Sequence, residues 1–159
     1  MGIRQAIKNG GGYFLLLNND TEVDPDFAVR MMEAAARPEV GIVGPKIYFF
    51  DDPDRIWYGG GGFIPGIWIP RHRGIRKKNS ESARRSGETG WVTGCAMLIK
   101  KEVIDDIGLL DRSYTIYCED IDFCLRAVDA GWKCFYEDSA KVWHKVCLLY
   151  TSPSPRDRS

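Results

Sequence analysis

The stretch YFLLLNNDTEVDP, residues 13–25, decides the fold expected for this chain. Residues 13–17 form an apolar run with the length and character of a buried parallel strand. Polarity changes abruptly at Asn18, and Asp24 followed by Pro25 has the pattern of a helix N-cap and a first helical residue. A strand, a short acidic loop and a helix are therefore predicted in that order. In open α/β sheets, ligands bind at this carboxyl edge of the strands.

The loop carries side chains that suit a hard divalent cation. Asn18 and Asp20 lie two residues apart, so their oxygen atoms face the same way if the loop is extended. Oxygen ligands of this kind suit Mg²⁺ or Mn²⁺, which keep waters and share their coordination shell with substrate phosphates. The residue types leave a second interpretation open, in which residues 18–21 supply only turn chemistry between a strand and a helix.

Composition restricts the classes of protein to consider. The 159 residues are enough for one domain, and Lys plus Arg equal Asp plus Glu at 22 each, so global charge indicates no nucleic-acid partner. No apolar run is long enough to span a membrane, and no secretory signal is visible. The cysteines lack paired CxxC spacing, which favours reduced thiols in a cytosolic protein over disulfides or zinc ligands. They are Cys95, Cys118, Cys124, Cys134 and Cys147.

Both ends have unusual patterns. Residues 2–12 have the pattern of the end of an amphipathic helix followed by a glycine stop, so we expect an α/β unit whose first strands are absent. Residues 147–159 lack periodicity, and residues 147–157 resemble the translation of a sequencing adapter. We therefore assign residues 1–146 to a partial α/β domain and residues 147–159 to a non-native or disordered tail. An exposed sheet edge and apolar surface are expected where the first strands would dock.

Periodicity and breaker residues predict the remaining elements. They are helices over residues 25–36, 101–107 and 119–131, and strands over residues 40–50, 91–100 and 132–136. Residues 57–90 form the longest irregular region, and a loop of this length is usually functional or mobile.

The long loop has basic and aromatic side chains that each allow two interpretations. The basic side chains either face an anionic acceptor or diphosphate, or form a solvated surface. They are Arg71, Arg73, Arg76, Lys77 and Lys78. The indoles of Trp57, Trp68 and Trp91 either stack on sugar faces or belong to the core.

A second acidic group opens the predicted helix 119–131. The helix dipole stabilises carboxylates at Glu119 and Asp120, and N-capping alone explains one of them. Together with Asp122, however, they repel one another unless a cation, a basic group or a bound proton is present. A carboxylate held ionised and partly desolvated can also act as a general base toward a hydroxyl. Further along the chain, His144 allows two interpretations: it has a structural role, or it binds a metal ion.

The order of these pieces resembles the family 2 glycosyltransferases of the GT-A fold, in particular the rhamnosyltransferase-type enzymes of bacterial polysaccharide assembly. The pieces are the strand leading into NND, the run WVTGCAM, the GLLD turn before EDIDFCLRA and the late histidine, and the likeness covers residues 2–146. The resemblance implies an α/β fold: a partial GT-A, Rossmann-like mixed sheet flanked by helices and lacking the first nucleotide-binding strands.

The resemblance implies a donor site around the first acidic group. Asn18, Asn19 and Asp20 correspond to the motif that binds the metal and the nucleotide diphosphate, with Asn18 in place of its first aspartate. Asp20 would then hold a Mg²⁺ or Mn²⁺ ion. His144 falls where some family members supply a further metal ligand.

The resemblance also implies a catalytic and acceptor side. Glu119 and Asp120 correspond to the family's ED motif, in which Asp120 is the catalytic base. Trp91, Thr93 and Gly94 correspond to a strand motif that lines the acceptor side.

The implied reaction is inverting, metal-assisted transfer of a sugar from a dTDP- or UDP-sugar to a hydroxyl of a glycan or lipid-linked acceptor. Polysaccharide or cell-envelope glycan synthesis is the implied process. A cytoplasmic location is expected, with peripheral association of a longer parent protein at the inner face of the cell membrane left open. Because family members bind the nucleotide base mainly through strands that would precede residue 1, we expect the chain alone to be inactive.

Two alternatives remain open at this point. A nucleotidyltransferase has a similar scaffold and a metal-binding carboxylate, and a non-catalytic module could use the aromatic loop to hold a glycan. A glycosidase would also use paired carboxylates, but it would not need a metal loop at the end of a strand.

Overall fold

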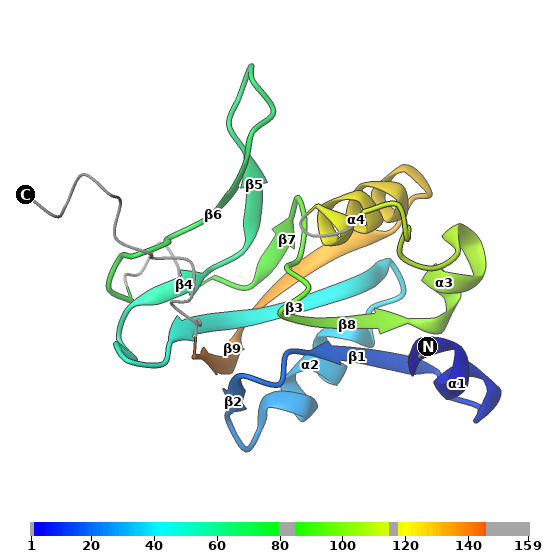
Figure 1. The fold of residues 1–159 in the computed structure, drawn as a ribbon, viewed down its shortest axis with the longest axis horizontal. Coiled ribbons are helices and arrows are strands. Elements are labelled where there is room, and N and C mark those ends of the chain that lie inside the picture. The colour runs from blue at the N-terminus through cyan, green and yellow to red at the C-terminus, as the bar shows by residue number, and fades with distance from the viewer. Residues whose placement is uncertain (1, 80–84, 115–117, 146–159) are drawn as a thin grey trace, which may run out of the picture.

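A computed structural model describes residues 2–79, 85–114 and 118–145, which form a mixed sheet flanked by helices (Figure 1). The main sheet has the strand order β1-β8-β3-β9-β2, with β4 paired to β3 and β7 paired to β9, while β5 and β6 form a separate hairpin. The strands are β1 (Tyr13–Leu17), β2 (Thr21–Val23), β3 (Val40–Phe49), β4 (Ile56–Tyr58), β5 (Gly61–Phe63), β6 (Pro70–His72), β7 (Gly87–Thr89), β8 (Ala96–Lys100) and β9 (Lys133–His144). The helices are α1 (Gly2–Lys8), α2 (Phe27–Ala35), α3 (Lys101–Ile107) and α4 (Glu119–Asp129).

The parallel pair β3 and β9 forms the centre of the sheet. Strand β3 is buried along nearly its whole length, as its apolar sequence predicts. The register of the pair shifts between Pro45, which lies opposite Glu137, and Lys46, which lies opposite Lys141, so the extra residues at this irregularity belong to β9. The buried ammonium of Lys46 forms an ion pair with Asp138 and a 3.2 Å hydrogen bond to Asn79, which compensates for its burial.

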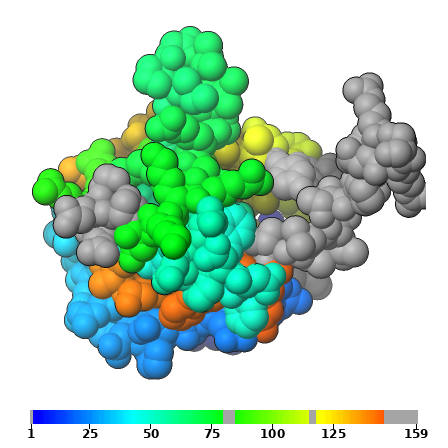
Figure 2. All heavy atoms as spheres, turned by 90° about the vertical axis from the view of Figure 1, so that its left-hand side faces the viewer, coloured from blue at the N-terminus to red at the C-terminus, as the bar shows by residue number. Residues whose placement is uncertain are grey.

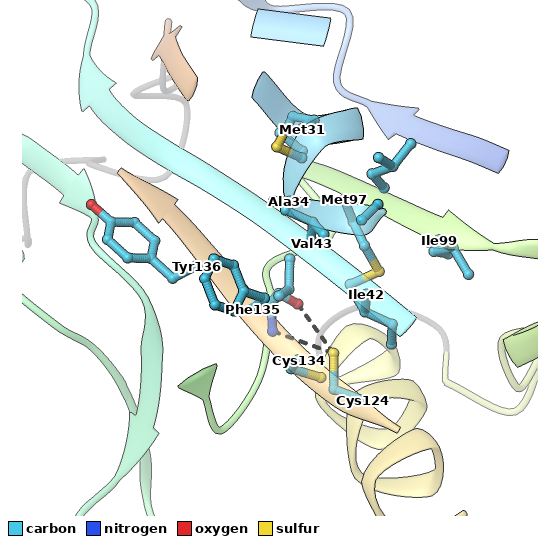
Figure 3. Close-up of a cluster of buried hydrophobic side chains, with 14 of the residues drawn as sticks. Met31, Ala34, Ile42, Val43, Met97, Ile99, Cys124, Cys134, Phe135 and Tyr136 are labelled. Atoms are coloured by element: carbon cyan, nitrogen blue, oxygen red, sulfur yellow. Dashed lines mark hydrogen bonds between the residues drawn. The ribbon is translucent and has the colours of Figure 1, made fainter. Parts of the chain in front are cut away.

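The core lies between this sheet and the helices. Helix α2 buries Met31 and Ala34 at helical spacing, and they pack with apolar side chains of β3 and β8 (Figure 3). Helix α4 contributes Cys124, whose thiol accepts a 3.3 Å hydrogen bond from the amide of Val92. The predicted helix ends at Asp129, and Gly131 follows in a left-handed conformation with φ of 95°. The core therefore fixes the start of α4, where the second acidic group lies.

The prediction that residues 13–17 form a buried parallel strand is wrong. Strand β1 pairs antiparallel with β8 and, among the described residues, has a strand neighbour on that side alone. Its burial alternates, because Phe14 is buried while Leu15 and Leu17 are 42% and 40% exposed. This is the exposed apolar sheet edge that the sequence predicts.

Several boundaries also differ. Residues 21–23 form β2 instead of continuing a loop, and α2 begins at Phe27 because Asp24 accepts hydrogen bonds from Asp26 and Phe27 in a turn. The long loop contains the short strands β4 to β7, β8 begins at Ala96, and β9 is one strand that extends to His144. The tail assigned to residues 147–159 lies outside the described residues.

Candidate functional site

Strand pairing brings Asp20 and His144 together. Thr21 of β2 lies opposite His144 at the end of β9, so the residue before Thr21 lies beside the imidazole. The Nε2 atom of His144 is 3.2 Å from Oδ2 of Asp20, and His144 is only 8% exposed. Asn18 and Asn19 precede this pair on the exposed part of the loop. The amide of Asn18 donates a 2.9 Å hydrogen bond to the carbonyl of Cys95, which fixes the loop to the start of β8.

Each side chain of the Asp20–His144 pair has one polar atom without a hydrogen-bond partner. Oδ1 of Asp20 and Nδ1 of His144 are buried, and each lacks a hydrogen-bond partner. Buried polar atoms usually have a partner, so these two suit a bound cation or its ligands. In the described part of the chain, no group of three or more His, Cys, Asp or Glu side chains could hold a metal ion. The pair therefore fits a divalent ion that takes its remaining ligands from water and substrate phosphates.

The second acidic group is anchored by backbone amides. Oδ2 of Asp120 accepts a 2.8 Å hydrogen bond from the amide of Gly94, and Oδ1 accepts one of 2.8 Å from Ile121. Gly94 leaves ordinary contact space, since a Cβ added there would be 3.6 Å from Cβ of Asp120. The two amides fix the orientation of the carboxylate and leave further lone pairs on its oxygens.

The other two acids of α4 have different surroundings. Asp122 accepts a 2.9 Å hydrogen bond from Arg126 one helical turn later, so its charge is compensated within the helix. Oε2 of Glu119 is buried and has no hydrogen-bond partner. Of the relief mechanisms predicted for three neighbouring acids, the structure provides a basic group for Asp122. Asp120 is stabilised instead by two backbone amides, which the sequence did not predict.

Residues 93–95 bring the two acidic groups to the same edge of the sheet. Gly94 contacts Asp120, and the neighbouring Cys95 contacts the loop that carries Asp20. Burial, with a further contribution from the Asp20 charge, raises the pKa of the Cys95 thiol to about 12. Asp20 and Asp120, 100 residues apart in the sequence, thus lie on either side of one short segment.

Trp91 and Thr93 are buried at this segment. Trp91 is 3% exposed, and its Nε1 donates a 3.0 Å hydrogen bond to the carbonyl of Gly62 in β5. Thr93 is 5% exposed, and its hydroxyl accepts a hydrogen bond from the amide of Cys95. Both side chains are therefore packed inside the protein, where they support the backbone of residues 93–95 and do not face solvent. Of the three residues predicted to line the acceptor side, Gly94 is the one in contact with Asp120.

A family model described as "Glycosyl transferase family group 2" matches residues 13–151, and so covers both acidic groups. The chain belongs to this glycosyltransferase family. The resemblance predicted from the sequence is therefore confirmed, together with its mixed α/β fold.

Curated relatives of this glycosyltransferase chain come from bacteria. It is 29% identical over 147 residues to the "N-acetylglucosaminyl-diphospho-decaprenol L-rhamnosyltransferase" of Mycobacterium tuberculosis (strain CDC 1551 / Oshkosh), covering 83% of this chain and 46% of the relative. It is 30% identical over 147 residues to the "O-antigen biosynthesis protein RfbC" of Myxococcus xanthus, covering 87% of this chain and 11% of the relative. The chain thus spans less than half the length of either relative.

Solved structures have the same fold. "Crystal structure of GalNAc-T7 with UDP, GalNAc and Mn2+" aligns with a TM-score of 0.65 at 15% identity, covering 88% of this chain and 30% of that one. "Crystal Structure of A197 from STIV" aligns with a TM-score of 0.52 at 14% identity, covering 89% of this chain and 62% of that one.

The glycosyltransferase chain has a cavity beside His144 that the sequence does not predict. Its volume is about 280 Å³. It is lined by Phe49, Phe50, Asp51, Asp52, Arg55, Arg76 and His144. Arg76 belongs to the basic group of the long loop, whereas Arg55 precedes β4 and pairs with Asp52 at 2.7 Å. No sequence motif marks this cavity, because the end of β3, the turn between β3 and β4, the end of β9 and Arg76 of the long loop form it together.

Aromatic rings connect this side of the site to the acceptor side. The ring of Trp57 lies edge-on to His144 at a centroid distance of 4.9 Å and to His72 at 4.7 Å. His72 also contacts the ring of Trp91 at 5.1 Å, and its Nδ1 is 2.9 Å from the carbonyl of Trp57. Burial lowers the pKa of His72, so its neutral form predominates at neutral pH, with Nδ1 carrying the proton. No sequence motif marks His72 as a site residue.

Proposed function

We propose that this chain forms the diphosphate and acceptor side of an inverting glycosyltransferase active site. The observation that carries the proposal is the approach of Asp120 and of the loop that carries Asp20 to one segment, residues 93–95, together with the contact between Asp20 and His144. A donor bound at the first two residues and an acceptor held near Asp120 would meet at this edge.

The donor side is assigned to the residues of the NND loop and His144. Asp20 and His144 would hold Mg²⁺ or Mn²⁺, which supplies positive charge to neutralise the departing nucleoside diphosphate. Asn18 and Asn19 are exposed beside this pair and can donate amide hydrogen bonds to phosphate oxygens. The structurally similar GalNAc-T7 was crystallised with UDP, GalNAc and Mn²⁺, and this supports the assignment by fold.

Asp120 is assigned the role of general base. An oxygen of Asp120 takes the proton of the acceptor hydroxyl, and the hydroxyl oxygen forms a bond to the anomeric carbon from the face opposite the donor phosphate. The bond from the anomeric carbon to the phosphate oxygen breaks, and the nucleoside diphosphate leaves. One displacement of this kind inverts the configuration at that carbon. Gly94 and Ile121 hold the base in place throughout.

The substrates are proposed from the relatives. A dTDP- or UDP-sugar is the proposed donor, and a lipid-linked glycan is the proposed acceptor, because the mycobacterial relative is named for a diphospho-decaprenol substrate. We also propose a location in the cytoplasm at the inner face of the cell membrane, where such a glycan would be assembled. Among the described residues, no helix has the length and apolar character needed to cross a bilayer.

Calorimetry with pyrophosphate tests the donor side without requiring a base-binding pocket. We expect Mn²⁺-dependent binding of pyrophosphate by the chain, lost in Asp20→Asn. Binding that is the same with and without Mn²⁺ would instead favour a non-catalytic glycan-binding module.

Transfer is tested in a chimera in which this chain replaces the matching segment of the mycobacterial relative. We expect a glycoside of inverted configuration from a dTDP- or UDP-sugar. Release of pyrophosphate from a nucleoside triphosphate and a sugar phosphate would identify a nucleotidyltransferase instead.

A further inference from the structure

The β5–β6 hairpin ends in an exposed apolar tip, residues 64–69 (IPGIWI), which the proposed reaction does not use. Figure 1 shows the hairpin projecting beyond the other elements, and Figure 2 shows the tip as a knob standing above the rest of the surface. Ile67, Trp68 and Ile69 are 61%, 73% and 52% exposed. Trp68 and Ile67 are the two most exposed large apolar side chains in the described ranges. Exposed apolar clusters of this kind usually mark an interaction surface.

The tip has a defined conformation. The amide of Ile64 donates a 2.9 Å hydrogen bond to the carbonyl of Ile69, and the amide of Trp68 donates one of 3.1 Å to the carbonyl of Ile64. The ring of Phe63 packs on that of Trp68 at a centroid distance of 5.4 Å. The backbone is thus closed on itself while the side chains point outward, so binding at the tip would cost little ordering entropy.

The charge around the hairpin is one-sided. Residues 55–80 contain six Lys and Arg and no Asp or Glu, although the whole chain has 22 of each sign. Five of the six are exposed and form no ion pair with a described residue, namely Arg71, Arg73, Arg76, Lys77 and Lys78. Arg73 lies over the ring of Tyr136 and Arg76 lines the cavity beside His144, which leaves Arg71, Lys77 and Lys78 for contact with a surface. An apolar tip with Trp and Ile followed by uncompensated cations is the pattern of an element that lies in an anionic membrane interface.

We infer that residues 64–69 insert into the headgroup region of an anionic bilayer, with Arg71, Lys77 and Lys78 contacting lipid phosphates. This inference rests on the proposed function. A lipid-linked acceptor presents its reacting hydroxyl at a membrane surface, so membrane binding would bring the active site to its acceptor. A second copy of the chain is a poorer partner, since a two-fold contact through this tip would bring two cationic segments together.

The base of the same hairpin belongs to the acceptor side of the site. Gly61 lies opposite His72, and its carbonyl accepts a 3.0 Å hydrogen bond from Gly90, next to Trp91. From this base to the pair Phe63 and Pro70 the strands extend roughly 7 Å at about 3.3 Å per residue, and the tip follows. A bilayer touching the tip would therefore lie near the segment that holds Asp120.

Flotation with lipid vesicles tests the inference on the purified protein. We expect binding to phosphatidylglycerol vesicles, weaker binding to phosphatidylcholine vesicles, and a blue shift of Trp68 fluorescence on binding. Trp68→Ser and Ile69→Ser should each weaken partitioning by about tenfold. Arg71→Gln and Lys77→Gln should each weaken it by about fivefold and reduce its dependence on salt.

The matched control is Val29→Ser, which removes an equally apolar, 57% exposed side chain from α2 and should leave partitioning unchanged. Absence of vesicle binding, equal binding by Trp68→Ser, or an equal loss in Val29→Ser would each overturn the inference. Self-association that Trp68→Ser abolishes, without vesicle binding, would assign the tip to a second copy instead. Vesicle binding needs neither donor nor acceptor. Failure of the transfer assay would therefore count against the proposed function and not against membrane binding by the tip.

Discussion

His144 and Asp20 lie 3.2 Å apart, Nε2 to Oδ2, although 124 positions separate them in the chain. The pairing of β2 with the end of β9 produces this contact, because it fixes Thr21 opposite His144. Both side chains keep one buried polar atom without a hydrogen-bond partner. The 3.2 Å contact and the unpartnered Oδ1 of Asp20 support the cation site that we propose for this pair.

Removing either member of this pair should weaken binding of pyrophosphate in the presence of Mn²⁺. Asp20→Asn removes the charge and His144→Gln removes the imidazole, and each should lower affinity by at least about tenfold, since even outer-shell changes at metal sites cost that much. Isothermal titration calorimetry measures the effect. Glu22→Gln is the matched control, because Glu22 is an exposed acid of the same segment that pairs with Lys145. Unchanged affinity in both variants would reject the metal assignment.

Asp120→Asn should abolish sugar transfer and leave donor binding unchanged. The amide oxygen can still accept the hydrogen bond from Gly94, but it is too weakly basic to take a proton, so the rate should fall by about 10²–10⁴-fold. The measurement is transfer by the chimera with the mycobacterial relative, beside pyrophosphate binding by the chain. Asp122→Asn serves as the comparison, because it removes only the pairing with Arg126 within α4. Full activity in Asp120→Asn would show that another group is the base.

The convergence of the two acidic groups could be predicted because each follows from local sequence. The NND run follows an apolar strand, and Glu119 and Asp120 open an amphipathic helix, so both fall at the ends of regular elements. Strand β2 could not be predicted, because three residues have no periodicity of their own and are ordered by pairing with β9. Because β2 was not predicted, the sequence pattern gave no reason to place Asp20 beside His144. Only the resemblance linked the two residues, as metal ligands.

The surroundings of a side chain were harder to predict than its element. The apolar run of β1 indicates burial on both faces, yet the strand is paired with β8 alone among the described residues, and neighbouring strands decide burial. Trp91 could be expected either in the core or against a sugar. Its burial depends on β5, which is distant in sequence: Gly61 leaves room for the indole, and the carbonyl of Gly62 accepts its hydrogen bond.

Gly61→Ala should destabilise the fold far more than Gly62→Ala. A Cβ at Gly61 would lie 2.4 Å from Cδ2 of Trp91, whereas a Cβ at Gly62 would meet nothing within 4 Å. Overpacking of this kind costs about 1–3 kcal/mol of unfolding free energy, whereas a substitution away from such contacts usually changes it by less than about 0.5 kcal/mol. Urea denaturation of the two variants measures the difference. Equal stabilities would mean that the indole moves aside freely, and that β5 does not fix the acceptor side.

Lowering the pH from 7.5 to 5.0 should destabilise the protein through His72. Burial lowers the pKa of this imidazole in the folded state, with Asp120 as an opposing charge, so the unfolded chain binds more protons than the folded one in this range. Stability is therefore complete above the unfolded pKa of 6.5 and is lost as the pH falls from there through the lower folded value. His72→Asn can still donate to the carbonyl of Trp57 but does not titrate, so its unfolding free energy should vary less between these pH values. Because the sequence has two histidines, His144→Gln is the matched control and should retain the loss of stability at low pH. A full loss of stability in His72→Asn would contradict the assignment to His72.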